Sequence, residues 1–316
     1  MMKFLAEAPR HFFFTGKGGV GKTSIACATA VHLARQGKRV LLVSTDPASN
    51  VAQVFGATIG NRVTPIEQVP GLATLEINPD EAAEEYRNKI LDPVRAILPA
   101  KEIKEITEQL SGSCTTEIAS FNEFTDLLAN PETTRDYDHI IFDTAPSGHT
   151  SRLLALPELM AAYTGGLMQR REQSNKFSRA VRGLGGTVDD PVERRNQEIR
   201  ATLLRRRRKF ERLRDILTDP AACTFHIVLT AERLPVLESI ELYDDLTSNS
   251  IRVPGLVINR RSPADAGEFM ASRRAVEDSA LSLLDSQLPD VPRVELPWLP
   301  GEIGTRAALA AIAERL

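Results

Sequence analysis

Cysteine is scarce in this 316-residue chain, and its three cysteines, Cys27, Cys114 and Cys223, lie far apart. An odd number of cysteines without a C-x-x-C pair argues against a disulfide framework and against a four-cysteine zinc site, and it favours a reducing compartment. Apolar stretches are short as well, since none approaches the roughly 18 residues that a membrane-spanning helix needs. The sequence therefore disfavours both disulfide-rich secreted proteins and integral membrane proteins.

A strong excess of one charge is also missing. The formal net charge is −3 and the isoelectric point is near 6.0, so the chain as a whole gives no electrostatic reason to bind nucleic acid. Near the N-terminus, Glu7, Pro9 and Arg10 stand where a secretory signal peptide needs its apolar core. We expect a cytoplasmic protein with no nucleic-acid partner.

What the sequence does contain is a glycine-rich turn within residues 11–24, between a short apolar run and a helical pattern. The turn fits G-x-x-x-x-G-K-[ST], the phosphate-binding loop of nucleoside triphosphatases. Glycines let backbone N–H groups converge on an anion at a helix N-terminus, the lysine neutralises phosphate charge, and the hydroxyl ligates Mg²⁺. The residues predicted to bind ATP are Gly16, Lys17, Gly18, Gly19, Val20, Gly21, Lys22 and Thr23.

Short apolar runs alternate with helical patterns along the rest of the chain. The first unit runs from an apolar strand around residues 12–14, through a helix over 25–36 that Gly37 ends, to a strand over 39–44. A strand–helix–strand unit of this length predicts parallel pairing. Further strands are predicted over residues 73–77, 138–143, 224–230, 255–259 and 293–296. Seven strands alternating with helices predict an open, doubly wound, mostly parallel α/β sheet.

Two helical stretches interrupt this series of strands. We therefore expect a single P-loop ATPase domain over residues 1–316, with a helical subdomain contributed by about 80–134 and 160–218. Its long helix starts at Pro191 and carries the run 205–209, RRRRK, which is most simply a solvated face; docking on a membrane partner or anionic lipid is the alternative. A last helix over 304–316 is expected to pack on the domain, the alternative being an amphipathic membrane tether.

Two aspartates stand at the carboxyl ends of predicted strands, Asp46 just after one and Asp143 as the last residue of another, at the edge where parallel sheets bind ligands. Asp46 is expected to orient or deprotonate the attacking water, and Asp143, which ends a Walker B type run, to hold Mg²⁺ through its water shell. A turn residue or helix cap is the alternative for each. Lys22 and Lys17 complete the predicted catalytic set. The loop pattern does not require Lys17, which acts either in trans on a partner's nucleotide or as a solvated lysine.

With Lys17, the loop KGGVGKT resembles the deviant Walker A motif of partition ATPases, nitrogenase iron proteins and arsenite ATPases. Three further segments, VSTDPASN, LSGSCTTEIASF and DTAPSGHTSRLL, resemble the ArsA arsenite/antimonite-efflux ATPase family, along nearly the whole chain. The resemblance implies two ATP sites that face each other across a two-fold interface, with Lys17 reaching across. It also implies Asp46 in switch I, Asp143 at the head of switch II, and Asn259 near adenine.

The same resemblance implies a site for As(III) or Sb(III) between two halves, with Cys114 and His149 as ligands. Thiolates suit such a soft ion. Because this chain has one loop where family members often have two, a homodimer is implied, with two thiolates and two imidazoles at its interface. The alternatives are a buried structural Cys114 and a His149 that is hydrogen-bonded within its loop. Cys27 and Cys223 are most simply structural.

Three functions follow. The first is an ATPase that energises metalloid efflux through an ArsB-type membrane carrier, peripheral to the inner membrane, with a metalloid chaperone as a further candidate partner. The second is an ATP-dependent targeting factor for tail-anchored membrane proteins, which the lack of C-x-x-C and the presence of Cys114 disfavour. The third is a partition or division-site ATPase, against which the net charge and the helical insertions count.

Overall fold

The structure, a computed structural model, describes residues 8–46, 50–95, 107, 119, 123–128, 134–144, 191–301 and 305–315. The chain divides into two compact units: Met1–Ser151 with Leu217–Leu316, and Arg152–Ile216. Helix α9 (Pro191–Thr218), most of which belongs to the second unit, matches the predicted long helix. The division into one P-loop domain with helical parts at 80–134 and 160–218 stays a prediction.

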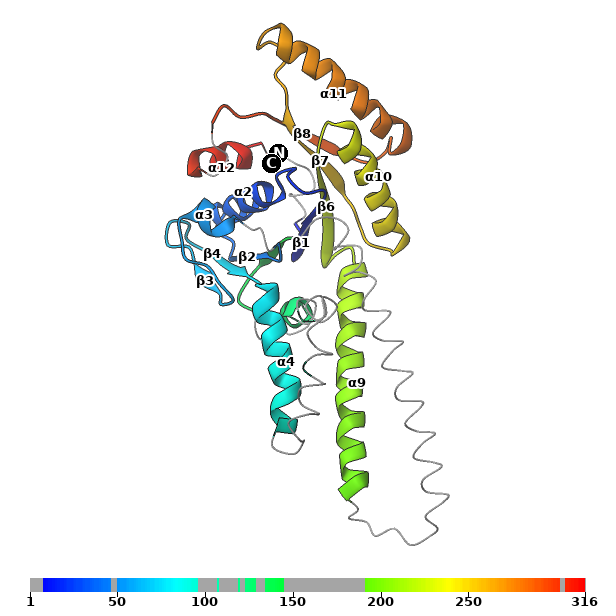
Figure 1. The fold of residues 1–316 in the computed structure, drawn as a ribbon. Helices are drawn as coiled ribbons and strands as arrows, with labels where there is room; N and C mark the ends of the chain where they lie inside the picture. The colour runs from blue at the N-terminus through cyan, green and yellow to red at the C-terminus, as the bar shows by residue number, and fades with distance from the viewer. Residues whose placement is uncertain are drawn as a thin grey trace. The chain divides into compact units, whose positions relative to one another are not determined.

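The first unit is built on an eight-stranded sheet (Figure 1). Its strands are β1 (His11–Thr15), β2 (Val40–Ser44), β3 (Thr64–Pro65), β4 (Leu72–Glu76), β5 (His139–Asp143), β6 (Cys223–Thr230), β7 (Gly255–Arg261) and β8 (Arg293–Pro297). They lie in the order β3-β4-β2-β5-β1-β6-β7-β8. Every neighbouring pair is parallel except β3 and β4, which are antiparallel. The predicted open, mostly parallel sheet is confirmed.

The central strand β1 shows why three consecutive phenylalanines form a strand here. Successive side chains of a strand point to opposite faces of a sheet. Phe13 stacks between Phe142 on β5 and Phe225 on β6, at centroid distances of 4.5 and 4.3 Å. Phe12 and Phe14 instead join the apolar cluster beneath helix α2. Since both faces of β1 are fully buried, an uninterrupted aromatic run is stable in this strand.

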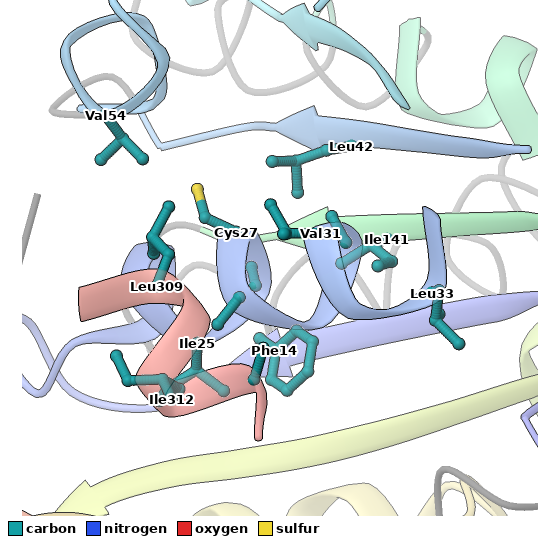
Figure 2. Packing of buried hydrophobic residues seen from close by; sticks show 14 of the residues in the cluster. Phe14, Ile25, Cys27, Val31, Leu33, Leu42, Val54, Ile141, Leu309 and Ile312 are labelled. Atoms are coloured by element: carbon teal, nitrogen blue, oxygen red, sulfur yellow. The ribbon is translucent and has the colours of Figure 1, made fainter. Parts of the chain in front are cut away.

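The described helices of the first unit are α2 (Lys22–Arg35), α3 (Val51–Phe55), α4 (Pro79–Arg95), α10 (Arg233–Ser248), α11 (Glu268–Gln287) and α12 (Arg306–Ala313). α12 packs on α2, and Figure 2 shows Leu309 and Ile312 of α12 beside Ile25 of α2. Thr305 caps α12 by accepting a hydrogen bond from the Ala308 N–H at 3.3 Å. The last helix therefore packs on the domain as predicted, since its apolar side is already covered.

Two of the cysteines are part of this core. Cys27 on α2 and Cys223 on β6 are free thiols with no exposed surface. Burial raises the thiol pKa of both well above its ordinary value, so neither forms a reactive thiolate. The structural interpretation of Cys27 and Cys223 is confirmed.

The arginine run of the long helix α9 is exposed at Arg205, Arg207 and Arg208, as a solvated face requires. Within the described part of the chain, no helix is both long and apolar enough to cross a membrane.

Candidate functional site

The turn between β1 and α2 depends on two glycines. Gly16 has a φ of 142° and Gly21 a φ of 98°, values that side chains of L-residues rarely allow. A Cβ atom on Gly16 would lie 2.1 Å from the Val228 carbonyl oxygen of β6, and one on Gly21 would lie 2.3 Å from Nδ2 of Asn259 on β7. The loop is pressed against β6 and β7, so neither position has room for a side chain.

The N-terminus of α2 opens directly from this loop. Gly21 is the N-cap residue, it provides no side-chain cap, and the first turn contains no acidic residue. The first amide groups of a helix lack partners within the helix, and the helix dipole adds a partial positive charge there. The arrangement is therefore suited to an anion such as a phosphate group.

Lys22, the first residue of α2, is 5% exposed. Its Nζ donates a hydrogen bond to the carbonyl oxygen of Lys17 at 3.2 Å, which holds the ammonium over the loop. Burial lowers the pKa of Lys22, while the negative charges of Asp143 and Asp46 act in the opposite direction. The side chain of Lys22 thus places a buried ammonium group beside the helix N-terminus, where it can donate a hydrogen bond to a phosphate oxygen.

Asp143 ends β5 next to the start of α2 and is fully buried. Its Oδ2 accepts hydrogen bonds from Thr23 Oγ1 at 2.7 Å and from Ser44 Oγ at 3.3 Å. Among the described residues, its Oδ1 has no hydrogen-bond partner. Burial raises the pKa of Asp143 to about 6, against the hydrogen bond from Thr23 and the charge of Lys22. A hard cation that prefers oxygen ligands, such as Mg²⁺, fits this donor set of one hydroxyl and one under-bonded carboxylate.

Asp46 follows β2 and lies close to the same group. Its backbone N–H donates to Ser44 Oγ at 3.4 Å, and that hydroxyl in turn donates to Asp143. The charge of Asp46 raises the pKa of both Asp143 and Lys22. The structure therefore brings together Lys22, Thr23, Asp46 and Asp143. Sequence reasoning missed Ser44, because a serine at the end of a strand has no distinctive pattern.

Asn259 on β7 contacts the loop from the other side and is 5% exposed. Its Nδ2 donates to the Val20 carbonyl oxygen at 2.9 Å, and its Oδ1 accepts from the Arg260 N–H at 3.0 Å. The Arg260 guanidinium donates to the Gly19 carbonyl oxygen at 3.1 Å. Asn259 thus contacts the loop, and its expected place near adenine stays a prediction. Arg260 is a contact that sequence reasoning missed.

Lys17 has a partner within its own chain. Its Nζ lies 2.6 Å from Oε1 of Glu238 on α10, and the two side chains are 38% and 39% exposed. Nothing in the sequence pattern indicates Glu238, since it lies 221 residues from Lys17. A role of Lys17 in trans stays a prediction.

The two predicted metalloid ligands, Cys114 and His149, lie outside the described residues. Within the part of the chain that is described, no group of three or more histidine, cysteine, aspartate or glutamate side chains is arranged to hold a metal ion. The metalloid site therefore also stays a prediction.

The parallel sheet, the glycine loop after its central strand, and the paired Thr23 and Asp143 define a P-loop nucleoside triphosphatase fold. Residues 9–316 match the family described as anion-transporting ATPase, and the chain belongs to this family.

Individual relatives agree with this assignment. An arsenical pump-driving ATPase of Acidiphilium multivorum is 42% identical over 318 residues, which are 99% of this chain and 51% of the relative. One of Escherichia coli is 43% identical over 302 residues, or 95% and 48% of the two chains. A putative arsenical pump-driving ATPase 2 of Aquifex aeolicus is 31% identical over 299 residues, or 93% and 94%. The chain spans about half the length of the first two relatives.

Proposed function

We propose that this protein binds ATP with Mg²⁺ at the loop and hydrolyses it to ADP and phosphate. The observation that supports the proposal most directly is the pairing of Thr23 with Asp143 beside the loop, with Oδ1 of the buried carboxylate unpartnered among the described residues. An under-bonded carboxylate is costly to bury unless a cation offsets it. Membership of an ATPase family supports the same reaction.

In this proposal each residue around the loop has a distinct role. The loop amides and Lys22 hold the phosphates, and Asn259 lies near the adenine. Thr23 and Asp143 would hold Mg²⁺, Asp143 through bound water, and the ion would supply charge neutralisation to the phosphate oxygens. Asp46 orients the attacking water and takes its proton as the new P–O bond forms and the bond to ADP breaks. Such a reaction needs mainly positioning and charge stabilisation, and these side chains are the contribution of one copy of the chain.

We further propose that two copies of the chain work together and that Lys17 of each reaches the nucleotide of the other. The lysine is well placed for this role because it is nearly two-fifths exposed. The closed pair would form with ATP and open after hydrolysis, which gives the enzyme two conformational states that a second ligand can bias.

The second ligand in the proposal is As(III) or Sb(III). Two relatives that are 42% and 43% identical are named arsenical pump-driving ATPases. We propose that arsenite or antimonite binds Cys114 and His149 from both copies, favours the closed dimer and raises the ATPase rate. Hydrolysis would then drive efflux through an ArsB-type carrier in the inner membrane, with a metalloid chaperone delivering the ion.

The test is the ATPase rate with and without antimonite, on protein whose mass in solution is measured by light scattering with a non-hydrolysable ATP analogue. We expect a dimer mass with the analogue and a higher rate with antimonite. Cys114→Ser should keep the basal rate and lose the stimulation, whereas Cys223→Ala, a buried cysteine in the sheet, should keep both. Full stimulation in Cys114→Ser would overturn the metalloid assignment.

The same purified protein distinguishes metalloid efflux from the alternative function, the targeting of tail-anchored membrane proteins. Co-purification of a hydrophobic helix, together with a rate that does not respond to antimonite, would replace efflux by targeting and leave ATP hydrolysis in place.

A further inference from the structure

The end of β7 is fixed by a buried cluster of charges. Arg261 is 2% exposed, and its guanidinium binds Glu277 of α11 at 2.6 Å and Glu295 of β8 at 2.8 Å. It also pairs with Asp278 of α11. A charged side chain is rarely buried unless it is fully paired, and removing one partner leaves an uncompensated charge. Arg261 therefore joins three elements at one point.

The strand end is also fixed through its next residue. Glu277 is itself 3% exposed and accepts from the Ser262 N–H at 3.1 Å and from the Ser262 hydroxyl at 2.5 Å. Arg274 on the same helix donates to the Ser262 carbonyl oxygen at 3.2 Å. Backbone and side chains just after β7 are thus both bound to α11.

Between this cluster and the loop the backbone is irregular. Arg260 has a φ of 58°, in the left-handed region, and the register with β8 shifts between Ile258 and Arg261. A left-handed conformation is unfavourable for a non-glycine residue and persists where its surroundings fix it on both sides. Here Asn259 and Arg260 bind the loop carbonyls of Val20 and Gly19, while Arg261 binds α11 and β8.

We propose that Arg261 is a positioning residue for the nucleotide site, acting through Asn259 and Arg260. With the Gly19 and Val20 carbonyl groups held in place, the peptide planes of the loop and their N–H groups are held as well. A loop that is already ordered loses less entropy when it binds phosphate, so it binds more tightly. The inference rests on the proposed function in one respect, that this loop is where ATP binds.

The test variant is Glu277→Gln, which keeps the size of the side chain but removes the most deeply buried of the three carboxylate charges that hold Arg261. We expect the KM for ATP, and the dissociation constant of a non-hydrolysable ATP analogue, to rise about five- to thirtyfold, the range that 1–2 kcal/mol of lost interaction gives. The value of kcat should change less than about twofold, because the residues proposed to act on water are not touched. The matched control is Arg293→Gln, which removes a 2.7 Å ion pair between β8 and Asp285 of α11 but none of the partners of Arg261, and should leave KM unchanged.

A lowered unfolding temperature with an unchanged KM in Glu277→Gln would overturn the proposal, because the cluster would then serve stability alone. Should that variant fail to fold, Arg260→Gly replaces it: glycine suits the left-handed backbone, and the change removes the Gly19 contact. It should raise KM in the same direction by a smaller factor, and an unchanged KM would again overturn the proposal. Failure of the proposed function gives a different result, since ATP would then still bind to Lys22→Gln as tightly as to the wild type.

Discussion

Lys17 Nζ and Glu238 Oε1 lie 2.6 Å apart, so a carboxylate on α10 holds the additional lysine of the loop within its own chain. Both side chains are nearly two-fifths exposed, and ion pairs of this accessibility contribute about 0–1 kcal/mol. Such a weak contact exchanges readily for another anion. Glu238 therefore restrains Lys17 only weakly, which is compatible with the proposed contact between Lys17 and a nucleotide bound to a second copy.

Replacement of Glu238 by glutamine should release this lysine. We expect ATP-dependent dimerisation to tighten by about two- to thirtyfold, because each dimer no longer breaks two ion pairs of up to about 1 kcal/mol each. The dimer dissociation constant is measured by sedimentation with a non-hydrolysable ATP analogue. Lys17→Ala is the control, and Glu238→Gln should have no effect on top of it. If Glu238→Gln instead weakens the dimer as much as Lys17→Ala does, the two side chains support dimerisation together. The interpretation of Glu238 as a restraint on Lys17 would then be wrong.

Gly16 and Gly19 form a matched pair for testing the loop. A Cβ on Gly16 would lie 2.1 Å from the Val228 carbonyl oxygen, whereas a Cβ on Gly19 would meet no described atom within 4 Å. Gly19→Ala should cost about 1–2 kcal/mol from its φ of 80° alone. Gly16→Ala must displace backbone, so we expect it to lower the unfolding midpoint further and to abolish binding of the ATP analogue. Equal unfolding midpoints for the two variants would contradict the close approach to β6.

The sheet could be predicted because its central strands are buried on both faces. The run of Phe12, Phe13 and Phe14, and the run ending at Asp143, are too short and too apolar for anything but inner parallel strands. β3 was missed because it has two residues, one of them Pro65, and so has no periodicity that a pattern can show. The placement of Lys22, Thr23 and Asp143 followed from the same logic, since the carboxyl ends of parallel strands meet at one edge.

The other contacts of the loop could not be predicted from spacing. Glu238 is 221 residues away from Lys17, and its helix packs beside β6 without any motif that marks the glutamate. The left-handed Arg260 and the buried Arg261 follow Asn259 directly, yet in the sequence they read as an ordinary polar strand end. Asn259 itself was indicated by the family resemblance alone. Contacts between elements distant in sequence depend on the finished fold.

Two buried histidines predict how stability depends on pH. Burial lowers the pKa of His11 to about 4 and that of His226 to about 3, from an ordinary value of 6.5. Because both pKa values are lowered, the two imidazoles stay neutral in the folded chain between about pH 6.5 and pH 4, whereas they are protonated in the unfolded chain. The free energy of unfolding should therefore fall on acidification from pH 6.5 toward 4, by about 1.4 kcal/mol per pH unit for each histidine.

The variant His226→Phe tests this, since the ring lies between Phe12 and Phe14, at centroid distances of 5.7 and 5.4 Å. Urea unfolding at pH 6 and pH 5 should show a slope that is shallower than in the wild type by about 1.4 kcal/mol per pH unit. His32→Gln is the control, because that ring lies on the outer side of α2 and is much less buried, so its slope should change far less. Parallel curves for the wild type and His226→Phe would show that this histidine does not contribute.

Asp143 predicts an effect of the opposite sign. Its folded pKa, about 6, lies above the ordinary 3.8 because the carboxyl is buried. The ionised form is therefore disfavoured in the nucleotide-free fold, and the stability linked to this group is lost as pH rises from about 4 through 6. At pH 7 the penalty is on the order of 1–3 kcal/mol. Asparagine keeps the shape and still accepts the Thr23 hydroxyl, without the charge.

Asp143→Asn should consequently be more stable than the wild type at pH 7, by about 1–3 kcal/mol in urea unfolding without nucleotide, and equal to it near pH 4. The same variant should lose about ten- to a hundredfold in Mg²⁺-dependent ATPase activity, because a neutral amide holds the hydrated ion poorly. The control is Asp138→Asn, at the exposed opposite end of the same strand segment. The Asp138 carboxylate accepts a hydrogen bond from the Arg39 N–H at 2.8 Å. This substitution should slightly lower the free energy of unfolding and leave the ATPase rate unchanged. A gain in stability together with a loss of activity at one residue is what a site built for a cation produces when the cation is absent. An Asp143→Asn protein that is less stable than the wild type at pH 7 would mean that the carboxylate is held for the fold itself, and the Mg²⁺ role would then lose its physical basis.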